Sequence, residues 1–93
     1  MSFSVTNAVD VFASNTRSVL LASANDRRRV INIWAGDSDI WFGNRSVTGG
    51  TIGNKISAGS RVELSLRGAI YVIRDGSDTG LCSFSEEISS GGL

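Results

Sequence analysis

Nine carboxylates and one cysteine are the side chains of this sequence best suited to move a proton or bind a metal, because the chain contains no histidine. Histidine is the commonest general base and a frequent metal ligand, so Ser-His-Asp and Cys-His mechanisms are excluded. Two carboxylates could still serve a glycosidase, one as acid and one as nucleophile. Glu86 and Glu87 are adjacent, however, and on a strand they would point to opposite faces. We expect no catalytic residue and no enzyme activity.

Two turns of the sequence carry pairs of aspartates, Asp37 with Asp39 and Asp75 with Asp78. Their oxygen atoms are ligands of the kind that calcium prefers. Their spacing does not match an EF-hand loop, which needs further acidic positions and a closing glutamate. Aspartate is also common in turns because its side chain bonds the nearby backbone. We interpret both pairs as turn residues and expect no metal and no cofactor.

The single cysteine, Cys82, can form neither an intramolecular disulfide nor a cysteine-based zinc site. Its neighbours Leu81 and Phe84 are apolar, and no nearby group would obviously lower the pKa of its thiol. We interpret Cys82 as a small buried core residue rather than a nucleophile.

The size and charge of the chain limit its class. Its 93 residues fit one domain, and 41% hydrophobic with 19% charged residues is typical of a soluble globular protein. Nine basic and nine acidic residues cancel, whereas nucleic-acid binding normally needs a basic excess. The N-terminus does not resemble a signal peptide, and no run approaches the roughly 18 apolar residues of a membrane span. We expect neither nucleic acid nor membrane as a partner, and assembly in a cytoplasm.

Short apolar runs alternate with turns along the chain, which has eleven glycines and no proline. The runs repeat with a period of two, typical of half-buried strands, and no window has the apolar spacing of a helix. The pattern predicts an all-β antiparallel sandwich or small barrel, with a core over residues 17–87, an N-terminal arm of irregular strands over 1–16 and a flexible tail over 88–93. The predicted strands lie near residues 9–12, 18–22, 29–35, 39–43, 61–66, 69–74 and 81–87.

The clearest pair of strands flanks the turn at residues 36–39, and we predict that they form a hairpin. Ile31, Ile33, Ile40 and Phe42 would face the core. The two tryptophans, Trp34 and Trp41, would then lie on the opposite face of neighbouring strands. The rings could be ordinary core under a second layer, or part of an exposed patch of the kind enriched at interface hot spots. A carbohydrate platform could use the same rings, although we expect only a sparse set of polar side chains beside them.

The only run of charges is Arg27, Arg28 and Arg29, at the entrance to this hairpin. It could guard a solvated strand edge. It could instead pair with carboxylates of another subunit, where the planar guanidinium group gives specificity.

The order of these segments resembles a group of small tailed-phage structural proteins, often head decoration, cement or head-fibre components. The resemblance covers about residues 17–87, and the chain departs from the usual pattern in its two tryptophans and its triple arginine. The segments that carry it are Arg28-Arg29, Val30–Ile33, Ile40–Gly43, Ile56–Gly59, Val62–Leu64, Ala69–Ile73 and a last strand that ends at Glu86.

The resemblance implies a jelly-roll-like β-sandwich on the capsid exterior of a virion, commonly a homotrimer that clamps neighbouring major capsid subunits. A tail or head-to-tail joint component and a small carbohydrate-binding module are the alternatives. If the protein decorates a capsid, we expect Trp34, Trp41 and Tyr71 to act as apolar anchors. Arg27, Arg28 and Arg29 would then fix the register of the contact.

Overall fold

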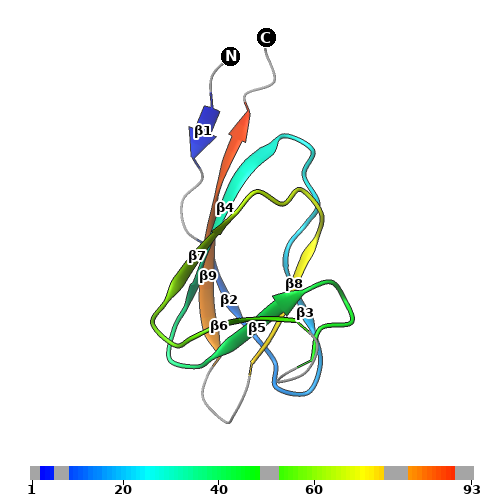
Figure 1. Cartoon of the computed structure of the whole chain (residues 1–93), viewed down its shortest axis with the longest axis vertical. Helices are drawn as coiled ribbons and strands as arrows, with labels where there is room; N and C mark the ends of the chain where they lie inside the picture. Colours follow the sequence, from blue (N-terminus) through cyan, green and yellow to red (C-terminus); the bar gives the residue numbers. More distant parts are fainter. Residues whose placement is uncertain (1–2, 6–8, 49–52, 75–79, 90–93) are drawn as a thin grey trace.

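A computed structural model of the protein describes residues 3–5, 9–48, 53–74 and 80–89 (Figure 1). Over these residues the chain forms nine strands and no helix. All the strand pairs are antiparallel, and the strands divide into two sheets that pack as a sandwich. The predicted fold class is confirmed.

One sheet has five strands and the other four. The five-stranded sheet contains β1 (Phe3–Val5), β2 (Val9–Phe12), β9 (Leu81–Ser89), β4 (Arg28–Ala35) and β7 (Arg61–Leu64). The four-stranded sheet contains β3 (Val19–Ala22), β8 (Ile70–Arg74), β5 (Ile40–Gly43) and β6 (Asn54–Ile56). Both β1 and β2 pair with β9, one after the other along its length, so they share a single edge position.

The connectivity is that of a jelly roll. β2 pairs with β9, β3 with β8, β4 with β7 and β5 with β6, as in one long hairpin. The β4–β9 and β5–β8 pairings then roll this hairpin into two layers. A double-sheet jelly roll of this kind is one way in which antiparallel proteins limit their free edges.

The predicted hairpin around residues 36–39 is wrong. β4 pairs with β7 and β9, whereas β5 pairs with β6 and β8, so the two strands belong to different sheets. The turn between them crosses from one layer to the other, and the N–H of Gly36 donates to the carbonyl of Leu81 at 2.9 Å. Alternation determines which side chains face inward but not which strand lies alongside, and the long β9 offers β4 a longer ladder.

The predicted ends of the domain also need correction. The strand predicted at residues 9–12 is confirmed, and residues 3–5 form a further strand, so the segment before residue 17 contributes two regular edge strands to the five-stranded sheet. Ile88 and Ser89 continue β9 and pair with β1, so they belong to the sheet and not to a tail. Residues 90–93 and the predicted turn at 75–78 lie outside the described residues.

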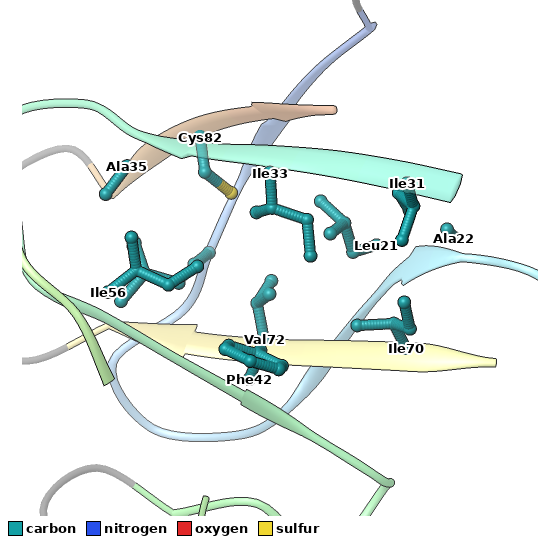
Figure 2. Close-up of a cluster of buried hydrophobic side chains, with 12 residues drawn as sticks. Leu21, Ala22, Ile31, Ile33, Ala35, Phe42, Ile56, Ile70, Val72 and Cys82 are labelled. Carbon is teal, nitrogen blue, oxygen red and sulfur yellow. The ribbon is translucent and has the colours of Figure 1, made fainter. Parts of the chain in front are cut away.

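The core lies between the sheets, and Figure 2 shows side chains of β4 and β9 pointing toward those of β5 and β8. The four residues predicted to face inward are all buried, with Ile31, Ile33 and Ile40 fully enclosed and Phe42 nearly so. The thinnest dimension of the molecule, 15 Å between Cα atoms, accommodates two sheets about 10 Å apart. The buried members of the core cluster are Ala13, Leu21, Ala22, Ile31, Ile33, Ala35, Ile40, Phe42, Ile56, Ile70, Val72 and Cys82.

One end of the sandwich contains a buried arginine in place of apolar side chains. Arg28 is 1% exposed, and its Nε donates to Oε2 of Glu86 at 2.6 Å. Its Nη1 donates to the carbonyls of Leu66 (2.8 Å) and Gly68 (3.1 Å), and its Nη2 donates to the carbonyl of Ser23 (2.5 Å). This guanidinium group therefore joins β4, β9, the connection before β4 and the connection that leads into β8.

We predict that Arg28→Met lowers the free energy of unfolding by about 3–5 kcal/mol, because it leaves Glu86 and three carbonyl groups without their cation. The matched control is Arg29→Met. Arg29 pairs with Glu87 at 2.8 Å in a more exposed position, and a surface pair contributes less than about 1 kcal/mol. Urea unfolding measures both losses, and equal losses would contradict the role given to Arg28.

Candidate interaction surfaces

Side chains that alternate away from the core form the outer faces of the two sheets. Trp41 and Tyr71 lie on the outer face of the four-stranded sheet, on β5 and β8. Trp34 lies on the outer face of the five-stranded sheet, on β4. The prediction that the tryptophans share one face is wrong, because it rested on the hairpin and the two outer faces point in opposite directions. Both rings are partly buried and neither belongs to the core cluster.

The outer face of the four-stranded sheet carries three accessible apolar or aromatic side chains, Leu20, Trp41 and Tyr71, beside the buried Ile73, and we call this the aromatic face. Lys55 of β6 lies opposite Trp41 on the same face. Leu20 lies opposite Tyr71, and Trp41 lies opposite Ile73 on the adjacent strand. Leu20 remains 43% exposed. The guanidinium carbon of Arg45 lies 5.5 Å from the centre of the Tyr71 ring, and its Nη2 donates to the Tyr71 hydroxyl at 3.2 Å. The sequence pattern did not single out Leu20 or Arg45, because β3 and the loop after β5 are distant from β8 in sequence.

Around Trp34 the outer face of the five-stranded sheet carries two polar rows, with the apolar pair Phe12 and Leu81 beyond them. One cross-strand row holds Asp10, Ser83, Trp34 and Arg61. The next row holds Ser85, Asn32 and Glu63. The expectation of few polar neighbours is therefore wrong, because these side chains come from β2, β7 and β9, far from Trp34 in sequence.

The three arginines have three different environments. β4 is an inner strand of its sheet, so the run does not guard a strand edge. Arg28 is buried, because an irregularity in register between Arg28 and Val30 turns it inward, and it cannot contact another subunit. Arg29 forms the ion pair with Glu87. Arg27 is exposed, its N–H donates to Oδ1 of Asn25 at 2.9 Å, and its carbonyl accepts from Ser89.

A pocket of about 250 Å³ lies where the ends of β5 and β6 meet the segment leading into β8. Phe42, Leu66 and Ile70 supply its apolar lining. The carbonyls of Leu66 and Gly68, beside this pocket, are the ones that Arg28 holds. The pocket thus depends on the buried arginine for part of its wall.

Three acidic side chains, those of Asp39, Glu86 and Glu87, serve local structure. The carboxylate of Asp39 accepts the N–H of Ala58 at 2.9 Å and lies 3.3 Å from Nζ of Lys55. The hydrogen bond from Ala58, and then Lys55, hold the pKa of Asp39 below its usual value. Glu86 faces inward to Arg28 while Glu87 faces outward, as their adjacency predicts. Within the described ranges no three metal-ligating side chains come together.

Comparison of the chain with protein-family models, with curated proteins and with solved structures returned no match. In the part of the chain that the structure describes, no helix is long and apolar enough to cross a membrane. The surfaces themselves are therefore the basis for assigning a function.

Cys82 is buried at 1% exposure, and its thiol donates to the carbonyl of Val11 at 3.3 Å. Burial raises the pKa of the thiol to about 11, and the negative charge of Asp10 adds to the rise. Between pH 9 and 11 the unfolded chain loses this proton while the folded chain keeps it, so stability that is present below pH 9 is lost as the pH rises. The urea midpoint should fall over this window more steeply for the natural protein than for Cys82→Ala. If the urea midpoints of the two proteins fall equally with rising pH, the raised pKa of Cys82 is contradicted.

The indole nitrogen of Trp41 is buried and has no hydrogen-bond acceptor among the residues that the structure describes. An unsatisfied buried donor costs about 1–3 kcal/mol, so its removal offsets the loss of ring area in Trp41→Phe. We predict that this variant stays within about 1 kcal/mol of the natural protein in urea unfolding. A loss above about 3 kcal/mol, as for a large core truncation, would show that the indole is satisfied and tightly packed.

Proposed function

We propose that this protein is a structural component of a phage virion that decorates the capsid and binds capsid subunits through its aromatic face. The observation that carries the proposal is the composition of that face, where the accessible side chains of Leu20, Tyr71 and Trp41 lie on three adjacent strands. Aromatic side chains with arginine nearby are the types most enriched at the centres of protein interfaces. The jelly-roll topology also agrees with this role, since viral capsid domains commonly use it.

Such a contact would extend beyond the strands themselves. A standard interface buries about 800 Å² on each partner. The strands of the four-stranded sheet have only three to five residues each, so a contact of this area would also include the loops around the aromatic face. The Arg45 guanidinium beside Tyr71 adds a donor at the rim, where a carboxylate of the capsid subunit would pair with it.

A homotrimer would strengthen this attachment without any new type of contact. Three copies present three aromatic faces to the same capsid position, so weak single contacts combine. Phe12, on the edge strand β2, is 63% exposed and supplies an apolar contact between copies. In this arrangement the aromatic faces remain available for the capsid.

The proposal predicts that the purified protein is a trimer in size-exclusion chromatography with light scattering, and that it cosediments with capsids assembled without it. Leu20→Ala should weaken capsid binding at least tenfold, which is about 1.4 kcal/mol. Leu66→Ala is the matched control, because Leu66 is exposed to a similar degree, 47% against 43% for Leu20, but lies off the aromatic face.

Equal binding by Leu20→Ala and the natural protein would contradict the assignment of the face, and a monomer that does not bind capsids would contradict the whole proposal. Cosedimentation with isolated tails or head-to-tail joints instead of capsids would likewise contradict decoration and place the protein at another position in the virion.

A further inference from the structure

The polar surroundings of Trp34 form a surface unlike the aromatic face. Trp34 lies directly between Ser83 of β9 and Arg61 of β7, and Ser83 in turn lies opposite Asp10 of β2. Directly opposed residues on neighbouring strands have Cβ atoms about 5 Å apart, and diagonal ones remain within reach at about 7–8 Å. The indole ring therefore has serine and arginine groups as immediate neighbours, and the carboxylate of Asp10 lies one strand further away.

The adjacent row extends this set of groups. Asn32 lies between Ser85 and Glu63, and its Oδ1 accepts from Nη1 of Arg61 at 3.3 Å. This bond orients the Asn32 amide, so its N–H groups are available as donors. Among the described residues, no partner engages the carboxylates of Asp10 and Glu63, which are available as acceptors.

We infer that this surface is a binding site for a neutral oligosaccharide, with a pyranose ring stacked on Trp34 and its hydroxyl groups bonded to the surrounding side chains. One face of a pyranose presents C–H groups that pack on an aromatic ring, while each hydroxyl both donates and accepts hydrogen bonds. The Trp34 surface supplies both kinds of partner, donors from Arg61 and Asn32 and acceptors from Asp10 and Glu63. The row from β2 to β7 crosses three strand spacings, about 14 Å, which is the length of a short oligosaccharide.

The chemistry of the surface favours a sugar over other ligands. The carboxylates of Asp10 and Glu63 would repel phosphate groups, so a nucleic acid does not fit. The centre of a protein interface is normally depleted of charged side chains, whereas here charged groups lie next to the ring. An aromatic ring with a few well-placed polar groups is the usual composition of a small-ligand site.

The test uses Trp41→Phe, in which Trp34 is the only tryptophan and reports binding by its fluorescence. The probes are cellohexaose, chitohexaose and mannohexaose. We expect a saturable change with at least one of them, at a dissociation constant below about 1 mM. Absence of a saturable change with all three up to about 10 mM would overturn the inference.

Calorimetry with the same oligosaccharide then locates the site. Trp34→Leu, which keeps an apolar side chain but has no aromatic face, should weaken binding at least tenfold. Asp10→Ala should weaken it severalfold, while its matched control Asp26→Ala, an exposed aspartate outside this surface, should leave it unchanged. Undiminished binding by Trp34→Leu, with its fold verified by circular dichroism, would overturn the inference. Because no capsid is present, this result is independent of the capsid-binding experiment.

Discussion

The fold depends on one buried cation at the end of its core. Arg28 places a full positive charge where the apolar layer ends, and such a charge is tolerated only when it is paired and fully hydrogen-bonded. Glu86 and three backbone carbonyls meet that requirement. Those carbonyls belong to the β3–β4 and β7–β8 connections, which cross between the two sheets. The guanidinium group of Arg28 therefore closes the end of the core and also holds both connections in place. Because Arg28 bonds the carbonyls of Leu66 and Gly68, it also holds part of the pocket wall in place.

The sequence predicts which side chains of a strand face the core much better than it predicts which strands pair with that strand. Alternation correctly identifies Ile31, Ile33 and Ile40 as core and Trp34 and Trp41 as outward, because burial has a period of two in any sheet. It contains no information on whether β4 pairs with β5 or faces it across the core. That choice depends on the length of β9, which β4 follows over most of its residues.

The same limitation explains the candidate surfaces. Tyr71 and Trp41 could be predicted as outward aromatic residues, but their neighbour Leu20 depends on the β3–β8 pairing, and the polar set around Trp34 depends on three other strands. Arg28 looks like any member of a charged run until the irregular register turns it inward. The pairing thus separates the two tryptophans onto opposite sides of the molecule. One side is largely apolar and suited to a protein partner, and the other carries polar groups around Trp34 with Phe12 and Leu81 beyond them.

The central claim is that these two faces have different partners, and hydroxyl-radical footprinting of the protein on its particle tests it most directly. Oxidation of each residue is compared between the free and the particle-bound protein. The account predicts that Leu20, Trp41 and Tyr71 become protected on the particle, while Trp34 is oxidised as in the free protein. Protection of Trp34 with unchanged oxidation of Leu20 and Tyr71 would contradict it.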